Sequence, residues 1–181
     1  MSSRRSGLRS GRRLLSALAL AFALAYGLLP ASAAGQASSA EDRRRFVSVT
    51  RQLEVAPLEP RLAAERQWAF NWLVEAPEVS VTVCANLWSG MMDENYAHGG
   101  AILIQYSLAM AVAVIERPDL ANDPIALQLA GAEGALRAYR AVVRDGREAH
   151  SPSLDAMVLI QSRGQLRDTV SSAWPGCAQQ G

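Results

Sequence analysis

The spacing of apolar and polar positions after residue 38 predicts helices. The clearest apolar stripe steps alternately by four and three residues, as one face of a helix does. It consists of Ile125, Leu129, Ala132, Leu136, Tyr139 and Val143. Asp123 or Asn122 would cap this helix, with Pro124 at its first position and Asp145-Gly146 at its end. Similar spacing predicts further helices over residues 39–54, 60–75, 101–115, 152–163 and 166–174.

Residues 101–115 are apolar on all sides except at Gln105, Tyr106 and Ser107. The segment is too short and too polar to span a bilayer, so we expect it at the centre of a bundle. Gly131 and Gly134 interrupt the helix over 124–145, where each glycine costs about 1 kcal/mol relative to alanine. We therefore expect these two glycines at close contacts with a neighbouring helix.

The segment 77–88 is ambiguous. Val79, Val81 and Val83 alternate with polar residues, which is typical of a strand. The chain beyond the N-terminal segment offers no second strand with which it could pair. We therefore predict a helix opened by Pro77, followed by a loop from residue 89 to 100.

The first 33 residues have the features of a secretory signal peptide. Five arginines and no acid precede an apolar run over residues 14–29, and Ala31-Ser32-Ala33 follows Pro30. The apolar run is shorter than the roughly 20 residues of a membrane-spanning helix, although an uncleaved anchor is the alternative. Two arginine pairs leave both the Sec and the Tat export routes open. We predict cleavage after Ala33 and a periplasmic or secreted protein.

Removal of 33 of the 181 residues leaves 148, which suits one domain. Five of the 18 basic residues are lost, so 13 remain against 17 acidic residues. The formal charge falls from +1 to −4, and an acidic domain is a poor nucleic-acid binder. We predict a flexible start over 34–40, a single all-α domain over 41–181, and no transmembrane span in the mature chain.

The chain has two cysteines, Cys84 and Cys177, both in the predicted mature part. An even number of cysteines in an exported protein favours a disulfide. Two buried thiols or one reactive thiol are the alternatives, but neither His98 nor His150 is adjacent in sequence to serve as a base. The predicted fold class is thus all-α, a compact bundle of five or six helices closed by one disulfide.

The search for catalytic and metal-binding motifs finds little. The chain has no phosphate-binding loop, no dinucleotide-binding glycine motif, no nucleophile elbow and no HExxH. Asp93, Glu94 and His98 are weak candidates for a metal site, because a structural role explains such a short cluster better. We therefore predict no catalytic residue, no metal and no other cofactor.

A few polar residues interrupt the apolar helices and form a candidate pocket inside the bundle. They are Gln105, Tyr106, Glu116, Glu133 and Tyr139. A structural alternative pairs Glu133 with Arg137 one helical turn away. It also places the Tyr139 ring in the core with its hydroxyl at the rim.

Several stretches resemble a set of small exported bacterial helical proteins of unknown function. They are Glu75-Ala76-Pro77-Glu78-Val79 leading to Cys84, Leu129-Ala130-Gly131-Ala132-Glu133, and Leu136 to Tyr139. The resemblance covers most of the mature chain. It implies export and a helical fold and no particular activity.

Composition, predicted export and the lack of catalytic motifs favour a non-enzymatic binding or structural protein of the bacterial envelope. Its partner would be a protein or another envelope component. An enzyme with a site of dispersed carboxylates is the first alternative, and a carrier of a small apolar ligand in the bundle core is the second. A partner-binding protein needs an exposed apolar patch, an enzyme a cleft with convergent polar groups, and a carrier an enclosed cavity.

Overall fold

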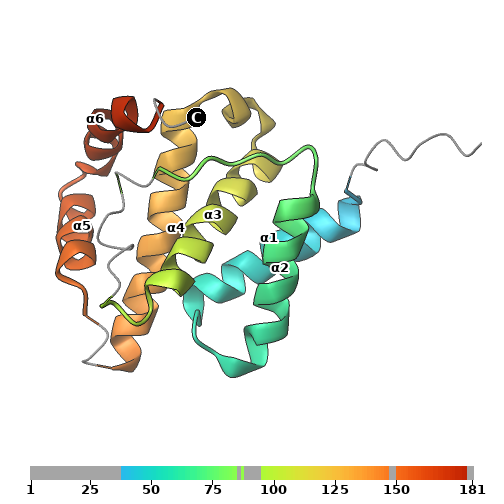
Figure 1. Ribbon diagram of the computed structural model, residues 1–181, viewed down its shortest axis with the longest axis horizontal. Coiled ribbons are helices and arrows are strands. Elements are labelled where there is room, and N and C mark those ends of the chain that lie inside the picture. The colour runs from blue at the N-terminus through green and yellow to red at the C-terminus, as the bar shows by residue number, and fades with distance from the viewer. Residues whose placement is uncertain (1–37, 85–86, 88–94, 147–149, 179–181) are drawn as a thin grey trace, which may run out of the picture. The chain divides into compact units, whose positions relative to one another are not determined.

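The computed structural model describes residues 38–84, 87, 95–146 and 150–178. The chain divides into two units, Met1–Gln36 and Ala37–Gly181, and all described residues belong to the second. Within them the structure contains six α-helices and no strand, together with a disulfide between Cys84 and Cys177 (Figure 1). The predicted all-α fold with one disulfide is confirmed. The predicted signal peptide lies outside the described residues.

The helices follow the predicted segments closely. They are α1 (Ala40–Val55), η1 (Pro60–Leu62), α2 (Ala63–Glu75), α3 (Gly99–Glu116), η3 (Pro118–Asn122), α4 (Pro124–Asp145), α5 (Pro152–Ser162) and α6 (Leu166–Ala178). Side chains of Ser39, Asp123 and Ser151 cap α1, α4 and α5 by accepting backbone N–H bonds. Gly164, between α5 and α6, has a positive φ of 73°, which a residue without Cβ adopts at little cost.

Helix α3 is the centre of the bundle. One side packs on α1 and α2 through a core cluster that includes Phe46, Leu53 and Leu108. The other side packs on α4, which also contacts α5 and α6, through a cluster that includes Tyr106 and Leu136. Figure 1 shows this order, with α3 and α4 between the α1–α2 pair and the α5–α6 pair.

Among the described helices, α3 is the one that is long and apolar enough to cross a membrane, judged by length and composition alone. Its 18 residues are 61% buried inside the protein. Such burial is typical of the central helix of a bundle, because every side of the helix then needs apolar side chains.

The predicted close contacts at the two glycines of α4 are confirmed. A Cβ atom at Gly131 would lie 2.8 Å from Met110 Cγ and 2.8 Å from Tyr106 Cε2, both on α3. A Cβ atom at Gly134 would lie 2.3 Å from the Cβ of Ala109. The backbones of α3 and α4 can approach this closely because both positions lack a side chain.

The helix predicted for residues 77–88 is wrong for the part that can be described. Residues 79–84 form neither helix nor strand, and we call residues 77–84 the strap. The strap leaves α2 and passes over α3 and α4 (Figure 1). Val79 is buried against the core, the Thr82 carbonyl accepts a 2.6 Å bond from the Gln128 amide, and Cys84 bonds α6. An extended chain spans about twice as much distance per residue as a helix, which lets eight residues make this connection.

The disulfide joins two buried cysteines, and their Cα atoms lie 5.3 Å apart. It connects the strap to the last turns of α6, 93 residues later in the chain. Both cysteines of the chain are therefore in this disulfide. A disulfide of this kind indicates an oxidising, non-cytoplasmic environment.

The end of the predicted flexible start over 34–40 is ordered. Ser39 caps α1, and the backbone N–H of Ser38 donates a 2.8 Å bond to Glu78 Oε1. Arg43 donates to the same carboxylate oxygen at 2.8 Å. These bonds connect the start of α1 to the strap, so the ordered domain begins before residue 41.

Candidate functional sites

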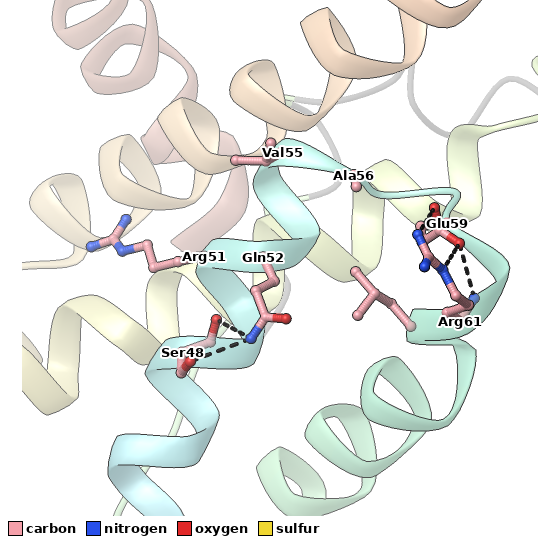
Figure 2. Close-up of a pocket in the computed structure, with 8 residues that line it drawn as sticks. Ser48, Arg51, Gln52, Val55, Ala56, Glu59 and Arg61 are labelled. Carbon is pink, nitrogen blue, oxygen red and sulfur yellow. Dashed lines mark hydrogen bonds and ion pairs between the residues drawn. The ribbon is translucent and has the colours of Figure 1, made fainter.

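A groove of about 730 Å³ lies between the C-terminal half of α1 and η1. Its lining consists of Ser48, Arg51, Gln52, Val55, Ala56, Glu59, Arg61 and Leu62. Figure 2 shows Ser48 and Gln52 on α1 across from the Glu59–Arg61 pair beside η1. Val55 is 68% exposed although it is aliphatic. The groove therefore presents apolar surface to solvent.

The polar side chains of the groove already bind one another or groups outside it. Arg61 Nε donates a 3.0 Å bond to Glu59, and the Gln52 amide bonds the Ser48 hydroxyl at 3.3 Å. Arg51 points away from the Glu59–Arg61 side in Figure 2 and pairs with Glu116 at 3.1 Å. The charges that line the groove are thus compensated, and an apolar, uncharged surface suits it best.

Next to the groove, Glu54 lies at the centre of an ion-pair network. Its side chain is 6% exposed and receives two bonds of 2.8 and 2.9 Å from Arg137 of α4, plus one of 3.3 Å from Arg51. The hydrogen bond with Glu54 raises the pKa of Arg137, so the guanidinium remains charged. These bonds pair Arg137 with Glu54 of α1. The sequence had suggested Glu133, one turn away on the same helix, as its alternative partner. This arrangement explains how a buried carboxylate is tolerated.

A second cluster of polar groups lies where α4 meets the start of α5. Tyr139 Oη donates a 2.6 Å bond to Asp155 Oδ1 and accepts a 2.9 Å bond from the Ser151 N–H. The other Asp155 oxygen lies 3.0 Å from His150 Nδ1. The cluster borders a hollow of about 330 Å³ lined by Tyr139, Arg140, Val143, Arg144, Asp155 and Val158.

The protonation states of this cluster follow from its contacts. Burial and the bond to Asp155 raise the pKa of Tyr139 above its ordinary value, so its hydroxyl remains a donor. Burial acts to raise the pKa of Asp155, but the bonds from Tyr139 and His150 outweigh it, and this pKa is lowered. Burial and the Asp155 charge raise the pKa of Tyr96, whose ring packs edge-on against Tyr139, to about 12. At neutral pH the cluster therefore contains one carboxylate and two neutral phenols.

Four residues of the predicted pocket have separate partners, namely Gln105, Tyr106, Glu116 and Tyr139. The Gln105 amide donates to the Thr50 carbonyl at 3.2 Å, and the Tyr106 hydroxyl donates to Gln128. Glu116 lines a shallow hollow beside α1, whereas Tyr139 belongs to the cluster described above. Each of these contacts joins one pair of neighbouring helices, so the residues do not converge on a common pocket.

Of the metal-site candidates, Asp93 and Glu94 lie outside the described residues. His98 directly precedes α3 and packs edge-on against Tyr96, with ring centroids 5.7 Å apart. Among the described residues, no group of three histidine, cysteine or carboxylate side chains could hold a metal ion.

Sequence reasoning did not find the pairing of His150 with Asp155. The two residues are five positions apart, a spacing that no helical or strand pattern brings together. They meet because His150 precedes the cap residue Ser151 and Asp155 lies in the first turn of α5. The only signal in the sequence was the Ser151-Pro152 helix start between them.

Comparison of this chain with family models, curated proteins and solved structures finds no significant match.

Proposed function

We propose that this protein is exported to the bacterial periplasm or exterior, where it binds another envelope component without catalysis. The disulfide supports residence in an oxidising compartment. The signal-like segment over residues 1–33 supports the route. The binding surface is the groove between α1 and η1.

The exposure of Val55 at the edge of the groove carries this proposal. A site for a small apolar molecule usually encloses most of its ligand. This groove is open along its length, so such a ligand would keep much of its surface in water. A protein partner covers an open groove with a continuous surface, and the compensated charges favour an apolar, uncharged segment of that partner.

The test uses a photo-crosslinking amino acid placed at Val55 in the exported, tagged protein. The matched control carries it at Leu159, an aliphatic residue of α5 that is 50% exposed and outside the groove. We expect a specific crosslinked partner from position 55 only. Val55→Asp should abolish capture of that partner by the protein without the crosslinker, and Leu159→Asp should preserve it. Equal crosslinking from both positions, or none from either, would refute the groove as a binding surface.

A further inference from the structure

We propose that two copies of this protein associate through the outer face of α2 in an antiparallel, two-fold symmetric dimer. The outer face consists of Ala63, Gln67, Phe70 and Val74, all of them exposed. This self-association goes beyond the binding of another envelope component and uses a different surface, because no residue of α2 lines the groove. Figure 1 shows α2 at the edge of the bundle, on the other side of α3 and α4 from α5 and α6.

The inner side of α2 packs on the bundle and fixes how the helix is rotated about its axis. Ala69 is buried, and the Trp72 ring lies 4.5 Å from the buried Phe46 ring, measured between centroids. Apolar residues continue on the outer face, where Phe70 is 40% exposed and Val74 is 71% exposed. A helix that is apolar on two sides and covered on one of them keeps apolar surface for a second contact.

The outer face of α2 is uncharged. Its four residues step by 4, 3 and 4 positions, which is the spacing of the contact stripe in paired helices. The structure describes α2 over its whole length, and the one charged residue among its exposed positions is Glu75, its last residue. The chain that remains after the expected cleavage is acidic, so two copies repel each other over most of their surface. At the uncharged face they can meet without this repulsion.

The order of the residues along this face fits an antiparallel copy of itself. A two-fold axis midway between positions 68 and 69 places position 63 opposite position 74 and position 67 opposite position 70. The small Ala63 of each copy then faces the larger Val74 of the other, which lets the two helices approach. Antiparallel axes also set the two helix dipoles in opposite directions. A parallel pair would place Val74 against Val74 and leave a gap at Ala63.

The polar residue of the face is compatible with this contact. The Gln67 amide donates a 2.8 Å bond to the Asn71 side chain one turn later on the same helix. It therefore keeps a hydrogen-bond partner when the Phe70 ring of the other copy covers it.

The size of the face sets the expected strength of the dimer. One face of a 13-residue helix buries less surface than the roughly 1,600 Å² of a typical stable interface, so the association should be reversible. The dimer population should then rise with protein concentration. A two-fold contact occupies the same face on both copies, so association should stop at the dimer.

The first experiment measures the mass of the exported, disulfide-bonded protein by sedimentation equilibrium, from about 1 µM to about 1 mM. We expect the monomer to convert to a dimer over this range. Val74→Glu should raise the dissociation constant by about tenfold or more, because it places a carboxylate in the apolar contact. The matched control is Leu159→Glu, which adds the same charge at a 50% exposed residue of α5 and should dimerise like the wild type.

The second experiment tests the antiparallel arrangement with a pair of variants. Ala63→Lys places a cation opposite position 74 of the other copy and should also weaken self-association. An equimolar mixture of Ala63→Lys and Val74→Glu should restore the dimer, because a Lys–Glu pair forms at one end of the face and the other end is unchanged. Both positions are exposed, so both variants should remain folded, which thermal unfolding checks.

A wild type that stays monomeric would overturn the proposal and leave this face to a different protein. Equal association of Val74→Glu and the wild type, or a mixture of the two charged variants that stays monomeric, would overturn it as well. Crosslinking from Val55 measures the groove, whereas the mass measures the face of α2. Failure of the dimer and failure of the binding groove are therefore distinguishable.

Discussion

Single positions in the α3–α4 contact decide how closely the two helices pack. Gly131 faces side-chain atoms of Met110 and Tyr106 at 2.8 Å, whereas Gly134 faces the Cβ atom of Ala109 at 2.3 Å. A methyl group at Gly131 requires these two buried side chains to shift. A methyl group at Gly134 requires the helix backbones to separate.

We therefore expect Gly134→Ala to destabilise more than Gly131→Ala, with both losses in the range of about 1–3 kcal/mol. Gly100→Ala is the matched control, because nothing lies within 4 Å of a Cβ atom there and it lies in the first turn of α3. This variant should gain up to about 1 kcal/mol. Urea unfolding midpoints measure all three. A higher midpoint for both α4 variants would contradict the close contact.

The hydroxyl of Thr50 is buried and has no hydrogen-bond partner among the described residues. Valine has nearly the same shape and removes the unsatisfied group, so Thr50→Val should stabilise the protein by about 1 kcal/mol. Thr50→Ser keeps the hydroxyl and loses a buried methyl group, so it should destabilise. Differential scanning calorimetry of the two variants gives the signs. A lower Tm for Thr50→Val would show that the hydroxyl is bonded in solution.

At the scale of elements, the strap is held at both ends by interactions distant in sequence. Cys84 anchors its end to α6, and Glu78 anchors its start to α1. Between these points the segment makes no regular hydrogen-bond ladder. Its position therefore depends on the two anchors, on the bond from the Gln128 amide to the Thr82 carbonyl and on burial of Val79.

Cys84→Ser, Cys177→Ser and the double variant should each lose about 2–5 kcal/mol of unfolding free energy, because the disulfide closes a long loop in the unfolded chain. The reduced wild type is the internal control and should unfold with the double variant. Equilibrium denaturation with and without reductant measures this difference, and peptide mapping without reductant should show one linked pair. Free thiols in native secreted material would contradict it.

The anchor at Glu78 should be sensitive to acid. The bond from the Ser38 hydroxyl, assisted by Arg43, lowers the pKa of Glu78 from 4.5 to about 2. A carboxyl whose pKa is lowered by folding stabilises the native state above its unfolded pKa. This contribution decreases as pH falls from about 4.5 towards 2.

Glu78→Gln should therefore lose less stability than the wild type between pH 5 and pH 3. Glu75→Gln, which changes an exposed carboxylate outside the anchor, is the matched control. Urea unfolding at the two pH values gives the comparison. An identical pH dependence for Glu78→Gln and the wild type would show that the anchor does not form in solution.

For the whole molecule, the proposed export predicts where the N-terminal segment is cut. We expect the mature chain to begin at Ala34 or Gly35, because Ala31-Ser32-Ala33 follows the apolar run. Cleavage there leaves only a few residues before the bond from Ser38 to Glu78. Mass spectrometry of the envelope fraction measures the mature mass. An intact N-terminus in that fraction would support the membrane-anchor alternative.

The sequence alone determined the six described helices, because their signals are local; it missed only that α6 continues past residue 174 through Pro175. The stripe from Ile125 to Val143 predicted α4, and the cap at Asp123 placed its start at the observed residue. The all-round apolar composition of 101–115 correctly predicted a central helix, and the glycines of α4 predicted its close neighbour. An even cysteine count, in a chain predicted to be exported, was sufficient to predict the disulfide.

The tertiary structure decided every feature that depends on residues meeting across the bundle. Residues 77–84 have a pattern compatible with helix or strand, but the distance from α2 to α6 requires an extended chain. Arg137 was within reach of Glu133 on its own helix, yet it binds Glu54, 83 residues away, because a buried carboxylate needs a charged partner more strongly. His150 and Asp155 meet at a helix start, where no periodic pattern applies. Periodicity encodes helix faces, whereas sites depend on how those faces are assembled.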